Sequence, residues 1–404
     1  MSVRVCHPFG NPNSYNAAAG LLQAGMLKSF HTSLYDPFGS GRRSHPELPQ
    51  SYVVTHPARE LLRLAAATLP LGRWNGRRRQ CIDWVTAAFD RATSRAVSPG
   101  DRAVYCYEDS AQYTFERAAR EGVLRVYELP IMHYREMRRI FDREVGLEPA
   151  LASFFQTFQE PAWKLERKDR EIEDADAIIV PADLVRASIQ AHLTPKAIFR
   201  TVPYGADVST VAKVWSSSER TGPLRLFFAG ILGPRKGVHT LFAALNGLPK
   251  ARYHLALAGR WEPGFREWLS RKYTVSYDWL GQLPHAAVYE ACRRSHVFVF
   301  PSLAEGFGLV ILEALASGIP VITTNHTGGV EILETGRDGW IVPAGEVEPL
   351  RNAIVAAIEH RDALPEMGRA ARRKAESFSW QRYRQTLRRS LEELLPAGKS
   401  AIYQ

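Results

Sequence analysis

The sequence is short of cysteine, and the cysteines that it has show no pairing pattern. Its 404 residues include Cys6, Cys81, Cys106 and Cys292, which are scattered along the chain. None of the spacings typical of zinc ligands or of a disulfide framework is present. The scatter disfavours a disulfide-stapled secreted domain and fits a protein in a reducing cytosol.

Long uncharged apolar runs are also missing, so nothing in the sequence predicts a membrane-spanning helix. The N-terminus runs directly into a strand-like segment, residues 3–6, without the apolar run and cleavage site of a secretory signal. We therefore expect a protein that is made and kept in the cytoplasm.

The composition contains neither low-complexity nor disorder-prone segments. Hydrophobic residues make up 45% and charged residues 23% of the chain, which is ordinary for a globular protein. At this length the chain can form two domains. No G-x-G-x-x-G follows the first strand, where the sequence reads Cys6-His7, so a dehydrogenase is a weak candidate.

Acidic residues are scarce near the N-terminus. The formal net charge is +10, and residues 1–105 carry 13 Lys/Arg against 6 Asp/Glu. Residues 58–89 mix Leu, Trp and Phe with Arg73 and with Arg77, Arg78 and Arg79. This composition suits contact with the anionic inner face of the cell membrane. An ordinary solvated basic face is the alternative, and it is slightly favoured. No motif indicates nucleic-acid binding.

What the chain does have is an alternation of strands and helices in two blocks, typical of doubly wound parallel sheets. In the second block we predict strands at residues 224–229, 253–258, 275–280, 296–300 and 321–323, and helices at 238–248, 285–294 and from about 309. In the first block we predict strands near residue 3 and at 103–107, 124–127 and 177–180. A surface loop is expected at residues 38–51, and a Ser-rich linker at 208–222 separates the blocks.

One segment of the second block predicts a strand, a glycine turn and a helix in succession. A β-branched and aromatic strand ends at Pro301, the turn contains Gly306 and Gly308, and the helix begins near Gly308 or Leu309. Free N–H groups and the dipole at such a helix start favour a diphosphate, and the glycines let a ligand come close.

Two carboxylates stand eight positions apart in this segment, Glu305 in the turn and Glu313 in the helix. The other positions of 309–316 are apolar, so Glu313 is expected in a largely buried helix, where a carboxylate without a partner is unfavourable. A ribose diol would supply that partner; an Arg or a neighbouring segment to be capped is the structural alternative. Together the two residues favour a nucleotide-sugar site.

A second glycine turn follows the strand at 224–229. It contains Gly230, Gly233, Arg235 and Lys236, at the carboxyl end of a parallel strand, where open α/β sheets bind ligands. We expect the two cations to neutralise a diphosphate, although a charged surface loop remains the alternative.

These residues resemble the retaining glycosyltransferases of family 4, which have the GT-B fold. The resemblance covers residues 203–380 well and the first block loosely. Its motifs are residues 203–207, the loop around Lys236, residues 279–283, Pro301-Ser302, residues 305–313, 327–331 and 378–380.

The resemblance implies two Rossmann-like domains facing across a cleft: residues 1–207 on the acceptor side and 223–380 on the donor side, with residues 381–404 crossing back as a helix. It also implies roles for single residues. Glu313 holds the ribose, Glu305 contacts the transferred sugar, and Lys236 binds the diphosphate. Backbone groups at Gly306, Phe307, Gly308 and Leu309 meet the sugar and diphosphate, and Leu283 lines the base pocket.

The chain departs from the family on its acceptor side. Ile231 stands where many members have an arginine, and we expect Arg235 to supply that charge. The usual paired glycines after the first strand are replaced by residues 9–15, which offer Asn13 and Ser14.

The cleft histidine of many members would correspond to His133, which is otherwise a structural or exposed histidine. Glu108 and Asp109 follow a strand and either bind acceptor hydroxyls or cap a helix.

The implied reaction transfers a sugar from a nucleoside diphosphate to an acceptor hydroxyl with retention, by front-face displacement. We expect no cofactor and no metal, since the sole Asp-x-Asp, Asp174 to Asp176, precedes a strand at the wrong end of the sheet. The expected acceptor is a glycan or lipid-linked glycan in bacterial surface polysaccharide synthesis. A non-catalytic nucleotide-sugar or glycan-binding protein, and a nucleotide-sugar epimerase on the same fold, remain alternatives.

Overall fold

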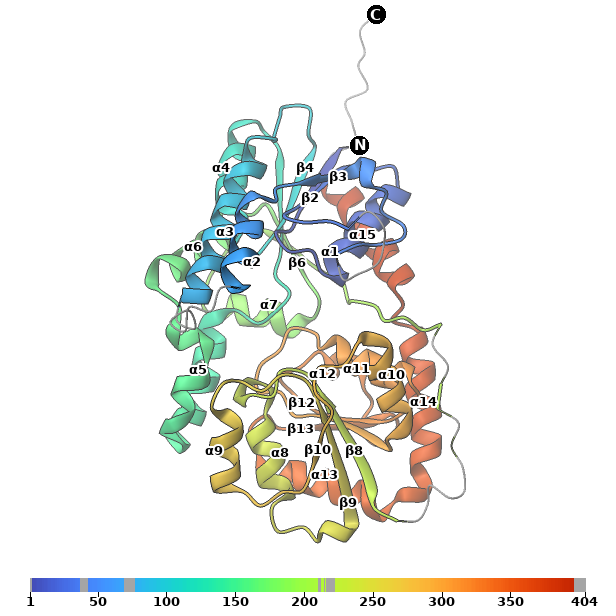
Figure 1. Cartoon of the computed structure of the whole chain (residues 1–404). Coiled ribbons are helices and arrows are strands. Elements are labelled where there is room, and N and C mark those ends of the chain that lie inside the picture. Colours follow the sequence, from blue (N-terminus) through green and yellow to red (C-terminus); the bar gives the residue numbers. More distant parts are fainter. Residues whose placement is uncertain are drawn as a thin grey trace, which may run out of the picture.

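The computed structural model has two lobes, one above the other in Figure 1, and each lobe is a parallel sheet covered by helices. It describes residues 2–36, 43–68, 77–209, 212, 213, 215 and 222–395, with the side chains of 66–68 and 77–79 left out. Arg73 and most of the predicted linker, including residues 216–221, lie outside the described residues, as do the side chains of residues 77–79.

The first sheet has seven parallel strands in the order β3-β2-β1-β4-β5-β6-β7. Its strands are β1 Val3–Cys6, β2 Leu27–Thr32, β3 Val53–Thr55, β4 Ala103–Tyr107, β5 Leu124–Glu128, β6 Ala177–Val180 and β7 Ile198–Thr201. The four strands predicted from the sequence are present, and β2, β3 and β7 are additional. Those three contain more polar or exposed residues, so their apolar signal is weaker.

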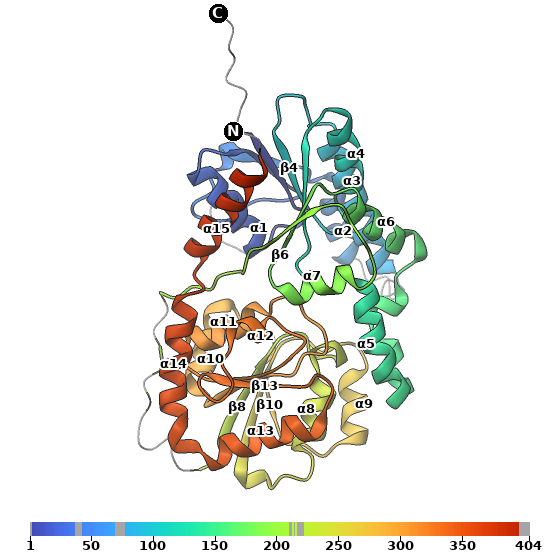
Figure 2. The same cartoon turned by 180° about the vertical axis from the view of Figure 1, so that it is seen from behind.

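Helices cover both faces of this sheet (Figures 1 and 2). They are α1 Pro12–Gln23, α2 Ala58–Thr68, α3 Arg77–Ser94, α4 Gln112–Arg120, α5 Tyr134–Leu147, α6 Ala162–Glu173 and α7 Asp183–Gln190, with short turns η1 Gln50–Tyr52, η2 Pro149–Phe154 and η3 Gln156–Gln159. α1 begins at a capping box in which Asn11 and Ser14 exchange side-chain and backbone hydrogen bonds.

The second sheet has six parallel strands in the order β10-β9-β8-β11-β12-β13. Its strands are β8 Leu224–Ala229, β9 Tyr253–Ala258, β10 Asp278–Trp279, β11 Val297–Phe300, β12 Val321–Thr324 and β13 Gly339–Val342. The strand predicted at 275–280 is wrong in extent: only the pair in β10 forms ladder bonds, at the exposed edge of the sheet.

The second lobe contains ten further helical segments and turns among its described residues. They are η5 Pro234–Lys236, α8 Val238–Leu245, η6 Lys250–Arg252, α9 Phe265–Lys272, α10 His285–Arg294, α11 Leu309–Ala316, α12 Gly329–Ile332, α13 Val347–Glu359, η7 Arg361–Ala363 and α14 Leu364–Glu376. α11 is packed nearly all round, as its apolar sequence predicts.

The chain passes between the lobes twice at one place. The amide of Ala206 donates to the carbonyl of Phe378 at 2.9 Å, next to the parallel bridge between Ala206 and Ser379. From there α15, Trp380–Leu394, runs back onto the first lobe and packs against α1, where Arg384 donates to the Asn16 side chain at 2.8 Å. The last described helix therefore crosses to the first lobe, as the resemblance implied.

A second connection is made by the segment from α5 to η3, which we call the α5 arm. In both views α5 reaches from the first lobe down the side of the second (Figures 1 and 2). His239 Nε2 lies 3.0 Å from the Glu144 carboxylate, and the Phe154 ring meets the Phe265 ring edge-on at 5.2 Å. The arm forms one wall of the space between the lobes.

In the described part of the chain, every helix is too short or too polar to cross a lipid bilayer.

Candidate functional site

The carboxyl ends of β8 and β11 open onto a cavity of about 480 Å³ between the lobes. Sixteen residues line it: Asn13, Pro130 and Tyr204 from the first lobe and its crossing segment, and Ala229, Gly230, Ile231, Arg235, Lys236, Val288, Phe300, Glu305, Phe307, Gly308, Leu309, Val310 and Glu313 from the second. This volume is in the range of small-molecule sites. The donor-side residues predicted from the sequence therefore gather here, with three exceptions described below.

The glycine turn between β11 and α11 brings the second lobe against the first. A Cβ on Gly306 would overlap the carbonyl of Pro130, so only glycine permits this approach. Gly308 has a φ of 79°, which places it in the left-handed region and turns the chain into α11. Gly308 and Leu309 at the start of α11 line the cavity, so the positive end of the helix dipole lies there. Among the described residues no side chain caps this helix start.

Glu305, Arg235 and Lys236 form one charge cluster at the base of the cavity. The Lys236 ammonium contacts one oxygen of Glu305, and Arg235 lies 3.3 Å from the other. Burial opposes ionisation of Glu305, but the two cations outweigh it and lower its pKa to about 2. Burial, reinforced by Arg235, lowers the pKa of Lys236 to about 8 despite Glu305. The cluster is thus a charged pair plus one additional cation.

Glu313 lines the same cavity from the first turns of α11. Its side chain is 14% exposed, and among the described residues its ion pair is with the exposed His285, whose Nδ1 is 3.7 Å away. Burial raises the pKa of Glu313. The structural alternative, an ion pair between a buried Glu313 and an arginine, is not found among the described residues. The carboxylate instead lines the cavity between the lobes.

Three predicted donor-side residues lie elsewhere. Leu283 is partly buried against the core before α10 and does not line the cavity, although Val288 of α10 does. Gly233 lines a neighbouring cavity beside Glu262. Gly306 touches Pro130 and lies between the lining residues Glu305 and Phe307.

On the first-lobe side, the two predicted residues after β1 have different environments. Asn13 lines the cavity, and its Oδ1 is buried without a hydrogen bond in the described structure. Ser14 is used by the capping box of α1. Tyr204 was not singled out: its hydroxyl donates to Glu128 at 2.5 Å, a fully buried carboxylate that also accepts from Tyr105. Only its place in the 203–207 motif pointed to it.

His133 lies outside the lining of both interlobe cavities. Its side chain is 2% exposed and its Nε2 is 3.1 Å from Asp169. Burial lowers the pKa of His133 to about 4, against the pull of Asp169, so the ring is neutral near pH 7. Its backbone amide donates to Ser188. This environment is that of a packed histidine at the start of α5.

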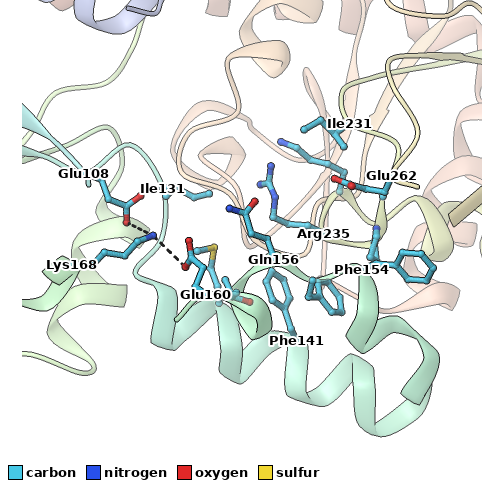
Figure 3. A pocket seen from close by; sticks show the side chains of 16 residues that line it. Glu108, Ile131, Phe141, Phe154, Gln156, Glu160, Lys168, Ile231, Arg235 and Glu262 are labelled. Atoms are coloured by element: carbon cyan, nitrogen blue, oxygen red, sulfur yellow. Dashed lines mark ion pairs between the residues drawn. The ribbon is translucent and has the colours of Figure 1, made fainter. Parts of the chain in front are cut away.

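A second cavity, of about 210 Å³, lies between the α5 arm and the loop after β8. Figure 3 shows Glu108, Lys168 and Glu160 joined by ion pairs at one end, and Phe154 and Glu262 at the other. Lys168 is 3.2 Å from Glu108 and 3.5 Å from Glu160. The sequence pointed to Glu108 but not to its ion-pair partners Lys168 and Glu160, because these come from α6 and from the residue shortly before it.

Asp109 is next to this cluster and has a φ of 68°, rare for a non-glycine residue. Its carboxylate is 3.2 Å from Lys164, and its amide donates to Glu171. Asp176 directly precedes β6, at the amino ends of the strands and away from Glu108 and Asp109, and it binds Arg125 at 2.6 Å. The Asp-x-Asp string is therefore remote from the cavities, as expected. Within the described residues no group of three acidic, His or Cys side chains is arranged to hold a metal.

Two Rossmann-like domains with parallel sheets facing across a cleft define the GT-B fold. Sucrose-phosphate synthase from Thermosynechococcus elongatus superposes with a TM-score of 0.74 at 18% identity, over 98% of this chain and 100% of that one. HepE from Anabaena, solved with UDP and glucose, superposes with a TM-score of 0.64 at 17% identity, over 97% and 100%.

Residues 212–374 match the family model described as Glycosyl transferases group 1. Glycogen synthase from Mycobacterium tuberculosis is 34% identical over 168 residues, which are 40% of this chain and 41% of that protein. This match therefore spans about two fifths of the relative's length. The family likeness thus covers the lobe that carries Glu305, Glu313 and Lys236.

Proposed function

We propose that the protein is a retaining glycosyltransferase that moves a sugar from a nucleoside diphosphate to an acceptor hydroxyl. The observation that carries this proposal is Glu313, a carboxylate in a mostly apolar helix that faces the interlobe cavity. The group 1 family match and the HepE complex with UDP and glucose support a nucleotide-sugar donor.

The donor is bound in three parts. Glu313 accepts hydrogen bonds from the ribose diol, which supply the polar partners that its apolar helix does not. The N-terminus of α11 and the cations Arg235 and Lys236 bind the diphosphate. The transferred sugar lies toward Glu305, whose ionised carboxylate accepts from its hydroxyls.

The catalytic requirement is stabilisation of the charge that develops on the departing diphosphate. Lys236 and Arg235 are held at that place by Glu305, in a site where burial strengthens electrostatic interactions. The acceptor oxygen attacks the anomeric carbon on the face that the diphosphate leaves, and a phosphate oxygen takes the acceptor proton. Configuration is thereby retained, and we propose that no metal takes part.

The proposed acceptor is a glycan or lipid-linked glycan in bacterial surface polysaccharide synthesis. A surface of the first lobe supports contact with a membrane: Leu61 and Leu62 of α2 are 52% and 60% exposed, and Arg59 stacks on the exposed Trp84 of α3 at 4.5 Å. Apolar side chains with nearby arginines suit an anionic interface. This surface would bring the enzyme to its acceptor at the inner face of the membrane.

A thermal-shift screen of nucleoside diphosphate sugars tests the proposal, because a donor that binds only the folded state raises the melting temperature. The preferred donor should stabilise the wild type, and Glu313→Ala should reduce its affinity by about 10-fold to 100-fold, as expected for losing charge-assisted hydrogen bonds. Glu348→Ala, an exposed position on α13, is the matched control.

Unchanged donor stabilisation in Glu313→Ala would contradict the ribose role. Nucleotide release then distinguishes a transferase from the two alternatives, a nucleotide-sugar epimerase and a non-catalytic binding protein. Release that depends strictly on an added acceptor indicates a transferase, whereas acceptor-independent release indicates an epimerase, and binding without release indicates a binding protein.

A further inference from the structure

The second cavity adjoins the proposed reaction centre. Ile231, Arg235 and Lys236 line both cavities, and the neighbours Pro130 and Ile131 line one each. The two spaces therefore meet on either side of the loop after β8. A group in the second cavity lies against the same cations that are proposed to hold the diphosphate.

The walls of this cavity combine flat apolar surfaces with polar edges. Met137, Phe141, Phe154 and Phe155 of the α5 arm form the apolar part, and Phe141 and Phe155 are stacked at 4.1 Å. Gln156 is exposed, and its side chain makes no hydrogen bond within the described residues. A sugar ring has the matching chemistry, since its C–H faces are apolar and its hydroxyl edges need donors and acceptors. The volume of about 210 Å³ is comparable with a single ring.

The charges of the cavity are unfavourable for an anion. Lys168 is shared between Glu108 and Glu160, and Lys164 behind it between Asp83, Asp109 and Glu160. Two ammonium groups thus face four carboxylates. At the other end Arg235 and Lys236 share the single carboxylate of Glu305, which leaves one positive charge. Glu262, which has no ion pair in the described structure, offsets that charge.

Building on the proposed transferase function, we infer that the second cavity is the acceptor subsite and that it takes a neutral sugar ring. Glu108, Glu160, Glu262 and Gln156 accept or donate hydrogen bonds at the ring's hydroxyls, while the phenylalanines pack on its faces. A phosphate or carboxylate on the ring would meet carboxylates whose charge exceeds that of the neighbouring lysines, and like charges in contact oppose binding.

The test measures acceptor-dependent nucleoside diphosphate release at saturating donor. The acceptors are 4-nitrophenyl hexosides, each compared with its uronic acid and its 6-phosphate. At least one neutral hexoside should be used, and kcat/KM should fall at least about tenfold for its anionic counterparts, as expected from charge repulsion in a partly desolvated site.

Two variants locate the effect. Gln156→Ala should raise the acceptor KM about tenfold, with the donor dissociation constant unchanged. Glu262→Gln should narrow the gap between the neutral hexoside and its uronic acid. Glu166→Gln, exposed on the outer side of α6 and absent from both cavities, is the control and should change neither value.

The inference is overturned if anionic acceptors are used as well as neutral ones, if no neutral hexoside is used although the donor binds, or if both cavity variants behave as Glu166→Gln does. Failure of the proposed function itself looks different. In that case no nucleoside diphosphate sugar stabilises the protein, whichever acceptor is present.

Discussion

At the scale of single residues, the charge of Lys236 depends on its buried surroundings. Burial and Arg235 lower its pKa to about 8, while Glu305 holds the ammonium in place. A bound diphosphate favours the charged form and raises this pKa. The ammonium therefore contributes fully to donor affinity below about pH 8, and the contribution is lost progressively as the pH rises from that value to the higher pKa of the complex.

We predict that the donor dissociation constant increases by up to about tenfold per pH unit above pH 8. Isothermal titration calorimetry between about pH 6 and 9 measures it. In Lys236→Arg the guanidinium stays charged over this range, so the same titration should be nearly flat. A wild-type profile as flat as that of Lys236→Arg would contradict the assignment of Lys236 to the diphosphate.

The charged residues of the two cavities could be predicted from the sequence to different degrees. Glu313 stands out because every neighbour in its helix is apolar, and Glu305 stands out by its glycine turn. Glu160 and Lys168 carry no such mark, since charged residues beside a helix are ordinary. They become part of a site only through Glu108, which lies more than fifty positions away in the sequence but 3.2 Å from Lys168 in space.

At the scale of elements, the crossing between the lobes depends on a close backbone contact. A Cβ on Gly205 would overlap the backbone of Ser379 and Trp380, where the two crossing segments meet. The glycine is needed for space, since its φ is not positive. The crossing therefore has little tolerance for a side chain.

Gly205→Ala should destabilise the protein by about 1–3 kcal/mol, as overpacking does. Urea unfolding measures this change. Gly146→Ala is the matched control: it lies inside α5 with nothing near its Cβ position, and it should stabilise by about 0.4–1 kcal/mol. Equal effects of the two substitutions would contradict the packing argument.

Strands were predicted well where they are mostly apolar and mostly buried. β4, β6, β8 and β9 have the predicted bounds, because a mainly apolar run between turn residues leaves little choice of structure. The edge and half-exposed strands β3 and β7 were missed, and β10 was predicted too long. β2 was missed although it is buried, because polar residues interrupt its apolar pattern. In such strands the hydrogen bonds to a neighbour, rather than the apolar pattern, decide where the strand ends.

At the scale of the whole molecule, the lobes are joined both by the crossing segments and by the α5 arm. The Glu144 and His239 side chains are 8% and 9% exposed, so this pair is desolvated between the lobes. Removing the carboxylate leaves the buried His239 Nε2 with the Thr240 hydroxyl, at 3.5 Å, as its remaining partner among the described residues. The arm should then hold the second lobe less firmly.

Glu144→Ala should lower the free energy of unfolding by about 1–3 kcal/mol, the effect of losing a buried hydrogen-bond partner. Small-angle X-ray scattering should also show a larger radius of gyration for the variant. Asp142→Ala, at an exposed position two residues before Glu144 on α5, is the control. A variant as compact and as stable as Asp142→Ala would show that the arm contributes little to the interlobe arrangement.

The two alternating blocks, the glycine turns and the carboxylates in them follow from the sequence alone, because they depend on periodicity and on neighbours within one or two turns. Which side chains from different lobes meet depends instead on the folded arrangement of the two lobes. His133 was drawn into a packed interior beside Asp169, while Gln156 and Glu160 came to face Arg235 across a cavity. Such contacts depend on how the two domains pack together. That packing results from many weak interactions between residues far apart in the sequence, and these leave no local pattern in the chain.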